Sequence, residues 1–416
     1  MTSSLIQANE KSIIIMKKIL LYSWLLLMPM MGHAQLEVDA DIISEGAKAL
    51  ADAPEKGSKV RNLVKKAKDY ADQRSVSNVD TFYIQTPDRP WRISVDSYLS
   101  QSDLQMKSTI DGSAIYSDVV GPLKCDPRIR TDVCTSVGVR VGYKGFAVHY
   151  AINVAGEKGR DFSLSSAGSW YCAHLRLHEF KTSEPEVKYE GNFVNIYEGT
   201  TDFMSFTDKW NLDSPIKART LVMDGYYIFN KRRFSYKAAY RQSVIQRRSA
   251  GSWLAGAMLY YSDFRYDKDP NANLILSMGD VGRIRQWQAN VGAGYGYNFV
   301  PAKGWLISAM AIPMLTLYNR VKTDLFDSNL RQLSLDEEEH DDDELPKSDY
   351  RISKMGSESR NSRISLNFNA RLSITYNWSR YFACVNGQFY NFRYHHKDHR
   401  GNLNDWYANA AIGVRF

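Results

Sequence analysis

Residues 363–377 read RISLNFNARLSITYN, and polar and apolar side chains alternate along the whole stretch. Alternation with a period of two is typical of a β-strand that has one apolar and one polar face. Strands of soluble proteins average about 5–6 residues, whereas a tilted strand that crosses a membrane needs about 9–11. The length of this stretch therefore favours a membrane-spanning β-barrel over a soluble β-sandwich.

The same alternation returns many times between residue 80 and the C-terminus. Residues 286–299, for example, place Trp287 and Val291 on one face and Asn290 on the other. We therefore predict an all-β fold, a transmembrane antiparallel β-barrel of about 12 strands (range 10–14) formed by residues 80–416. The expected strands are 91–99, 135–144, 146–154, 167–180, 190–199, 219–229, 252–264, 285–299, 305–318, 363–377, 381–392 and 405–416.

The last expected strand ends on an aromatic side chain, Phe416. Bacterial outer-membrane barrels commonly end in this way, so the strand resembles a signal that is read by the barrel-assembly machinery. With the C-terminus in the periplasm, short connections such as 181–189 fall on the periplasmic side. Long loops such as 155–166 and 319–362 then fall on the outer side, as membrane barrels require.

Residues 1–34 have the features of a secretory signal peptide. Two lysines precede an apolar run at 19–31, and Ala34 supplies a small residue at the expected cleavage site. The run is too short for a membrane-spanning helix, which needs about 20 residues. Met16 is an alternative start. Residues 35–79 follow as an expected periplasmic helical arm, and export places the chain in the cell outer membrane with membrane lipid as a partner.

The composition argues against some functions. The formal net charge is +7 over 416 residues, and acidic and basic stretches are kept apart, so nucleic-acid binding is not supported. We expect no cofactor, and no soluble ligand is indicated. Aromatic residues make up 12% of the chain, which fits the aromatic girdles of membrane barrels.

The phase of the alternation predicts which charged side chains face the lumen. Asp96 and Asp224 are expected to point inward together with a larger set of basic side chains. A lumen rich in Arg and His could select anions in an open pore, or the same side chains could form a hydrogen-bonded plug. The basic lumen-facing candidates are Arg140, His149, His174, Arg176, His178, Arg363, Arg371 and Arg415.

Two further sets of residues are weaker candidates for sites. Cys125 and Cys134 enclose a short loop in an exported chain, so they could form a disulfide or stay as two thiols. His395, His396 and His399 could ligate a metal, or they could be exposed loop histidines.

One expected connection is longer than a barrel needs. Residues 230–251 would be a periplasmic turn, yet they contain seven basic residues. Short turns are the rule on this side of a barrel. The segment could dock under the barrel, fold into the lumen or extend the two neighbouring strands.

The same segment carries a resemblance to a known family. The matching residues are Phe234, Ser235, Tyr236, Ala238, Ala239, Tyr240, Gln242, Ser243, Gln246, Ser249 and Gly251. Supporting stretches are DTFYI at 80–84, GYGYN at 294–298 and GVRF at 413–416. Over about residues 75–416 the sequence resembles Bacteroides-type outer-membrane proteins of domain-of-unknown-function family 4421. The resemblance implies an exported outer-membrane barrel of a Gram-negative bacterium, of unknown role, and supplies no catalytic residues.

The sequence is compatible with three classes of function. The first is a non-enzymatic protein, either a porin-like pore or transporter or an envelope scaffold. The second is an outer-membrane enzyme acting on lipid or glycan, with His395 as a candidate acid–base group. The sequence has no Gly-x-Ser-x-Gly motif and no His at an expected lipid-facing position, so we expect no enzyme. The third is a surface adhesin acting through loop 319–362, whose acidic run at 336–344 could bind divalent cations or be a solvated loop tip.

Overall fold

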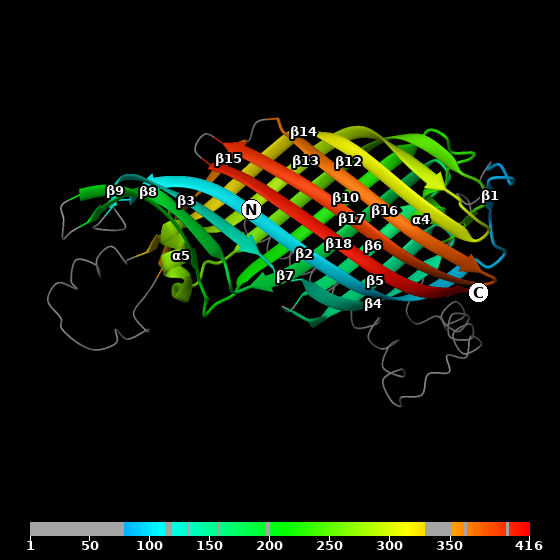
Figure 1. Ribbon diagram of the computed structural model, residues 1–416, viewed down its shortest axis with the longest axis horizontal. Coiled ribbons are helices and arrows are strands. Elements are labelled where there is room, and N and C mark those ends of the chain that lie inside the picture. Colours follow the sequence, from blue (N-terminus) through cyan, green and yellow to red (C-terminus); the bar gives the residue numbers. More distant parts are fainter. Residues whose placement is uncertain are drawn as a thin grey trace, which may run out of the picture. The chain divides into compact units, whose positions relative to one another are not determined.

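The computed structural model describes residues 79–112, 119–131, 133–156, 159–195, 200–328, 352–361, 364–396 and 399–416. Within these ranges, twelve antiparallel strands form a closed barrel (Figure 1). The predicted fold class is therefore confirmed. The barrel strands are β2 (Trp91–Asp111), β4 (Cys134–Tyr143), β5 (Phe146–Ala155), β6 (Arg160–Ala167), β7 (Tyr171–Thr182), β10 (Ile216–Ile228), β12 (Ala250–Arg265), β13 (Val281–Phe299), β14 (Trp305–Ser328), β16 (Leu366–Trp378), β17 (Tyr381–His396) and β18 (His399–Arg415).

The barrel closes between its first and last strands. Residues 92–107 of β2 pair with residues 400–415 of β18. The backbone of Phe416 continues this ladder, because its N–H donates to the carbonyl of Trp91 (3.0 Å) and its carbonyl accepts from the N–H of Trp91 (3.1 Å). Lipid offers no hydrogen-bond partners to the backbone, so strands can cross a membrane only in a sheet without a free edge.

The two ends of the barrel differ in their connections. At the turn end, where Phe416 ends the last strand, neighbouring strands are joined by short connections and by one longer segment, residues 229–249. At the opposite end, the loop end, several strands continue beyond the barrel (Figure 1). The short connections of the turn end are residues 144–145, 168–170, 300–304 and 379–380.

Two expected elements differ from the structure. Residues 155–166, expected to be an outer loop, contain most of the barrel strand β6, whose sequence RDFSLSSA is short and mostly polar. Residues 190–199, expected to be a barrel strand, overlap β8 (Glu186–Asn195), which lies outside the barrel. These two errors cancel in the strand count. They also mean that β7 runs opposite to the expected direction and that residues 181–189 lie at the loop end.

A smaller outer sheet extends the wall at the loop end. β3 (Val119–Arg130) pairs with the far half of β2, β8 pairs with β3, and β9 (Thr200–Lys209) pairs with β8. On the other side, β15 (Ile352–Asn361) pairs with the far part of β14. The short helices η3 (Asp269–Asn271) and α5 (Ala272–Ser277) follow β12. The hydroxyls of Tyr189 and Ser277 lie 3.3 Å apart, so α5 packs against β8.

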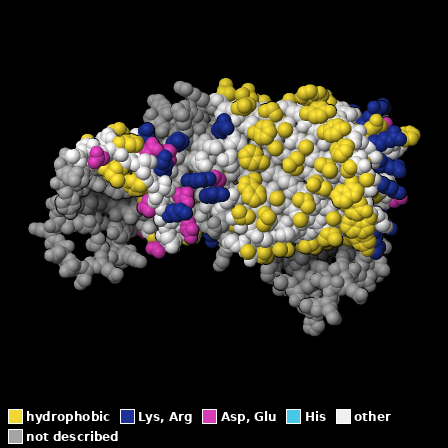
Figure 2. Space-filling model, in the orientation of Figure 1, with side chains coloured by type: hydrophobic (Ala, Val, Ile, Leu, Met, Phe, Trp, Pro, Cys, Tyr) yellow, Lys and Arg dark blue, Asp and Glu magenta, His cyan; other side chains and the backbone are white. Residues whose placement is uncertain are grey.

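The outer face of the barrel is apolar. On β16, the side chain of Leu372 is 62% exposed, whereas that of Asn369, three residues earlier on the opposite face, is fully buried in the lumen. Figure 2 shows hydrophobic side chains spread over the barrel wall, with Lys and Arg gathered at both ends of this apolar band. The alternation in the sequence is therefore an alternation between a lipid-facing and a lumen-facing side.

The height of the apolar band matches a membrane. Trp287 and Tyr297 lie ten residues apart on the outward face of β13, one toward each end of the band. At a rise of about 3.3 Å per residue and a tilt of about 40°, they are separated by about 25 Å along the barrel axis. This is about the height of the apolar belt of a membrane barrel. Tyr and Trp side chains form a girdle at the turn end, in contacts such as Trp305–Tyr376 and Trp378–Tyr381.

None of the helices in the described ranges is long and apolar enough to cross a membrane.

A charge placed on the lipid-facing side should destabilise the barrel. We expect Leu372→Arg to lower the free energy of unfolding by about 2–4 kcal/mol, because Leu372 lies near the middle of β16 and the guanidinium would have to enter lipid. The measurement is equilibrium unfolding by guanidinium chloride in lipid vesicles. The matched control is Met355→Arg, because Met355 is similarly exposed (58%) but lies on β15 of the outer sheet. Equal losses in the two variants would contradict the assigned lipid face.

Candidate functional site: the lumen and its turn-end mouth

The segment between β10 and β12, residues 229–249, folds into the lumen and is named the plug. It contains the one-turn helix α4 (Tyr236–Tyr240) and the short strand β11 (Ile245–Gln246), which pairs with β1 (Ile84–Gln85). Of the three arrangements open for residues 230–251, the structure therefore shows insertion into the lumen.

The sequence of the plug explains its local fold. Ser235 caps α4, since its hydroxyl accepts a hydrogen bond from the N–H of Ala238 at 3.2 Å. The side-chain oxygen of Gln246 accepts from the N–H of Ser235 at 3.0 Å, and its amide donates to the carbonyls of Arg233 (2.6 Å) and Arg248 (2.9 Å). Gln246 thus ties the two halves of the plug together and satisfies three of its backbone groups, of which the N–H of Ser235 is buried.

The plug is hydrogen-bonded to the inner face of β16. The hydroxyl of Ser373 donates to the carbonyl of Ala239 at 2.6 Å, and the hydroxyl of Tyr240 donates to the carbonyl of Arg371 at 3.2 Å. The guanidinium of Arg371 also donates to the hydroxyl of Tyr236. Helix α4 is therefore held by specific polar contacts, and a sliding movement along the wall would break them.

Arg371 links the plug to a buried ion pair. Its guanidinium donates to a carboxylate oxygen of Asp224 on β10 at 2.6 Å. The other oxygen of Asp224 accepts from the hydroxyl of Tyr390 at 3.1 Å and lies 3.4 Å from a ring nitrogen of His174. All four side chains are buried. One charged cluster thus joins strands β7, β10, β16 and β17 to the plug.

A second charged cluster, the lumen ion network, connects further strands. One carboxylate oxygen of Asp96 lies 3.0 Å from His149 Nε2, and the other lies 3.4 Å from Arg140 Nη2. Asp161 lies 3.8 Å from His149 Nδ1, so His149 bridges two aspartates. These side chains come from β2, β4, β5 and β6, and all are buried.

The network continues through Asp161 to the last strand of the barrel. The carboxylate of Asp161 accepts from Arg176 Nε at 2.6 Å and lies 3.4 Å from His178 Nδ1. Arg176 also reaches Asp405 on β18 at 3.5 Å, and Asp405 accepts from the hydroxyl of Ser102 at 3.0 Å. The positive and negative charges of the lumen therefore neutralise one another across the barrel.

Of the two alternatives for the charged lumen side chains, this arrangement favours a hydrogen-bonded network across the lumen over the lining of an open pore. In a water-filled channel the lining side chains would be exposed, yet Arg176 is 2% and Asp161 is 4% exposed. Anion selection needs cations that are free to meet the ion, whereas Arg140, Arg176 and Arg371 each lie within 4 Å of a carboxylate.

The structure places most of the basic candidates inside the barrel. Arg363 lies outside the described residues. All others have buried side chains that point into the lumen or its turn-end mouth, namely Arg140, His149, His174, Arg176, His178, Arg371 and Arg415. The family-signature residues from Phe234 to Ser249 belong to the plug, and Gly251 lies at the start of β12.

Sequence analysis missed several partners of these residues. Asp161 lies on β6, the strand mistaken for a loop, so no inward phase was assigned to it. Asp405 and Tyr390 do lie on expected strands, and the alternation places both on the inward face. That phase was the signal that could have found them.

The candidate disulfide between Cys125 and Cys134 is excluded by the strand register. Cys125 of β3 pairs with Ser108 of β2, whereas Cys134 of β4 pairs with Ser100. Both cysteines therefore lie along one edge of β2, eight residues apart, which is about 26 Å at 3.3 Å per residue. A disulfide needs Cα atoms within about 7 Å.

Some sequence-based candidates fall outside the described part of the chain. This holds for the expected signal peptide, for the arm up to residue 78 and for the acidic run at 336–344. The backbones of His396 and His399 pair where β17 and β18 meet. The side chains of His395, His396 and His399 are outside the described set, so the metal site there stays a prediction.

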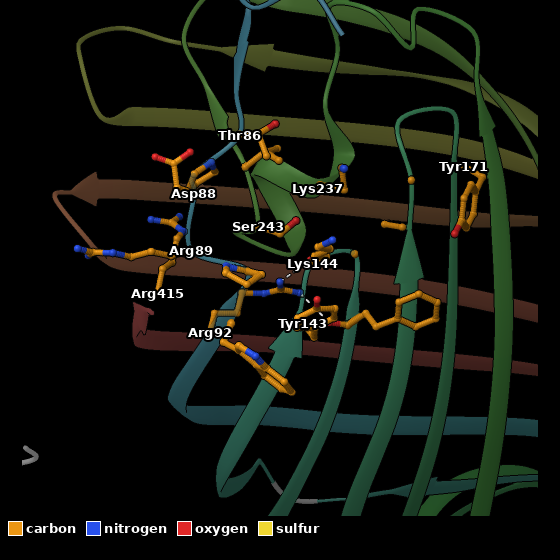
Figure 3. A pocket seen from close by; sticks show the side chains of 18 residues that line it. Thr86, Asp88, Arg89, Arg92, Tyr143, Lys144, Tyr171, Lys237, Ser243 and Arg415 are labelled. Carbon is orange, nitrogen blue, oxygen red and sulfur yellow. Dashed lines mark hydrogen bonds between the residues drawn. The ribbon is translucent and has the colours of Figure 1, made fainter. Parts of the chain in front are cut away.

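A cavity of about 430 Å³ opens at the turn end, between the plug and the wall (Figure 3). Arg92 of β2 lies at its edge and donates to the carbonyls of Lys144 (2.5 Å) and Phe146 (3.0 Å). Lys237 of α4 lines the cavity from the plug side. Burial, together with the positive charge of Arg92, lowers the pKa of Lys237 from 10.5 to about 8.

The family described as Domain of unknown function (DUF4421) matches residues 79–416. This chain belongs to that family. The match spans the barrel together with the plug, so the plug is part of the family domain. Among curated proteins, none matches this sequence.

Several solved membrane proteins have a weak likeness to the barrel. The beta domain of the Bordetella autotransporter BrkA is 10% identical, with a TM-score of 0.26, and 79% of this chain and 100% of that chain are covered. The outer membrane protease OmpT from Escherichia coli is 8% identical, with a TM-score of 0.27 and coverages of 80% and 98%. The P. putida toluene transporter TodX is 8% identical, with a TM-score of 0.23 and coverages of 79% and 91%. At such low TM-scores, these proteins indicate nothing about the role of this chain.

Breaking the Arg371–Asp224 pair should destabilise the barrel strongly. We expect Arg371→Met to lower the free energy of unfolding by about 3–5 kcal/mol, because it leaves a buried carboxylate without its cation. Adding Asp224→Asn to that variant should recover part of the loss, since the unpaired charge is then removed. Guanidinium chloride unfolding in lipid vesicles measures both effects. The single variant Asp224→Asn is measured as well. If the free energy of unfolding lost in the double variant equals the sum of the losses in the two single variants, Arg371 and Asp224 do not act as a unit.

The partly buried ammonium of Lys237 should make stability depend on pH. A basic group whose pKa is lower in the folded state than in the unfolded state destabilises the fold at every pH at which it stays charged in the folded protein. This cost is complete below about pH 8 and vanishes as the pH rises toward 10.5. We therefore expect Lys237→Met to stabilise the protein at pH 7 and to have little effect at pH 10.5, as measured by chemical unfolding. Lys231→Met, at an exposed position of the same segment, is the matched control and should show no such difference.

Proposed function

We propose that this protein is a non-enzymatic outer-membrane barrel with a closed lumen, and that it serves as an envelope scaffold instead of a constitutive pore. The observation that carries the proposal is the plug. Helix α4 is hydrogen-bonded to the inner wall through Ala239, Tyr240 and Tyr236. Beyond it, the lumen ion network joins β2, β4, β5, β6, β7 and β18 through neutralised charges.

The proposed location is the outer membrane of a Gram-negative bacterium of the Bacteroides type, reached through the expected signal peptide. Support comes from the apolar band and from the unequal ends of the barrel, because outer-membrane barrels have short periplasmic turns and longer outer loops. In this orientation the turn end faces the periplasm and the outer sheet faces the outside. Outer-membrane lipid is then the partner of the apolar face, and the terminal strand that closes on β2 is the part offered to the barrel-assembly machinery.

The absence of enzymatic activity is part of the proposal. The His–Asp contacts of the lumen resemble acid–base pairs, but His149 and Asp96 are almost completely buried (1% and 2% exposed). A catalytic base must reach the proton that it abstracts, directly or through one water. The enzyme alternative depends on His395, and the adhesin alternative depends on the middle of loop 319–362. The side chain of His395 and residues 329–351 lie outside the described part of the chain.

Single-channel conductance in a planar bilayer tests the proposal. We expect the refolded wild-type barrel to be silent, because the plug lies inside its lumen and is hydrogen-bonded to the wall. A variant in which residues 232–247 are replaced by a short Gly-Ser linker should conduct, since it lacks α4 and its contacts with β16. A shift of the unheated sample on electrophoresis would verify that each protein is folded.

Each outcome has a definite meaning. A steady conductance of the folded wild-type protein would overturn the closed lumen and make transport the working function. Silence of a folded protein without the plug would show that the plug is not the element that closes the barrel. A silent wild-type protein together with a conducting variant would support the proposal.

A further inference from the structure

The turn-end cavity differs in charge from the rest of the lumen. Its lining contains five basic side chains and one acidic side chain, Asp88, which is exposed. Among the described residues, Arg92, Lys237 and Arg415 have no ion-pair partner, whereas the arginines of the lumen clusters are all paired. The basic residues of the lining are Arg89, Arg92, Lys144, Lys237 and Arg415.

Two of these arginines have a guanidinium nitrogen without a hydrogen-bond partner among the described atoms. Arg92 uses both terminal nitrogens on backbone carbonyls, but its buried Nε has no hydrogen-bond partner among the described atoms. Arg415 donates to the carbonyl of Gln242 at 2.8 Å and to the side-chain oxygen of Asn377 at 2.6 Å. Its buried Nη1 has no hydrogen-bond partner among the described atoms. Leaving a buried charged donor unsatisfied costs free energy, so such groups indicate an acceptor that is not part of the chain.

The cations also repel one another. The charges of Arg241 and Arg415 both act on Arg92, and that of Arg92 acts on Lys237. Arg241, on the plug beside this group, has a buried Nε without a hydrogen-bond partner among the described atoms. Like charges brought together at low dielectric destabilise a fold. An anion bound among them would relieve this repulsion.

We propose that the turn-end cavity binds a phosphate-type oxyanion. Arginine and lysine side chains are the common protein ligands of phosphate, arginine through several fixed donors and lysine as a point charge. In Figure 3, Lys237 extends from the plug on one side of the cavity and Arg92 extends from the wall on the other. An anion between them would bridge the plug to β2.

The cavity has room for more than the anion itself. Its volume of about 430 Å³ is that of a small-molecule site. The aromatic pair Trp91–Tyr143, with ring centroids 4.7 Å apart, lies beside the basic group on the girdle of the turn end. The phosphate could thus belong to a soluble molecule or to the head group of a lipid at the membrane interface. This inference does not depend on whether the lumen is closed.

Calorimetric titration of the full chain in detergent distinguishes these sources. The soluble probe is glycerol phosphate, and the lipid probe is dihexanoyl phosphatidic acid, which carries the same head group on two short acyl chains. Binding of both probes supports a soluble ligand, and binding of the second alone supports a lipid head group. Failure of both probes to bind overturns the proposal.

A variant of Lys237 tests whether the binding occurs in this cavity. We expect Lys237→Met to weaken the binding at least tenfold, because it removes the only cation that the cavity receives from α4. The ammonium group of Lys237 makes no hydrogen bond among the described residues, and the backbone bonds of this residue do not depend on its side chain, so its replacement should leave the fold intact. The control is Lys231→Met, which removes an exposed charge of the same segment outside the cavity. Unchanged binding in Lys237→Met, or equal weakening in both variants, would overturn the assignment.

Discussion

The hydrogen-bond ladder between β2 and β18 is the interaction on which the rest of the structure depends. In lipid, an unpaired row of backbone N–H and C=O groups would cost several kcal/mol for each group. Closure by residues 92–107 against residues 400–415 removes both free edges at once. It also separates the two faces of every strand, because the outward face meets lipid and the inward face is cut off from lipid and largely from water.

The content of the lumen follows from that separation. Polar side chains on twelve inward faces must find partners inside the barrel, since bulk water does not reach them. Asp161 and Asp224 are each contacted by an arginine and by at least one histidine. The plug completes the set by supplying backbone carbonyls and tyrosine hydroxyls to β16. Among the described residues, the cations around Arg92 and Lys237 at the turn-end mouth lack such ion-pair partners.

Much of this fold could be predicted from the sequence because a membrane strand is a local pattern. Residues 363–377 show their period, their length and the phase of their side chains without reference to any other part of the chain. The same reasoning failed for β6, whose few apolar residues give a weak pattern, and for β8, whose alternation is as good as that of a barrel strand. Periodicity reports which way a side chain points but not which strand lies beside it.

The pairings in the site depend on that missing information. Arg176 and Asp405 are 229 residues apart in the chain, and only closure of the barrel brings them together. The register of β2 likewise decides that Cys125 and Cys134 are too far apart to react. The plug was visible as an unusually long basic connection. Its position in the lumen follows from contacts of Ala239 and Tyr240 with β16, which no local pattern encodes.

The pairing of β1 with β11 gives the plug a mechanical connection to the chain that precedes the barrel. Ile84 pairs with Gln246, and further backbone hydrogen bonds join Asp80 to Arg232 (2.9 Å) and Tyr83 to Arg247 (2.7 Å). A force applied to the chain before residue 80 would act on these few backbone hydrogen bonds first, and only then on the long ladders between β2 and its neighbouring strands. Tension would therefore act first on the plug, and the barrel wall would stay intact while its internal segment was drawn toward the turn end.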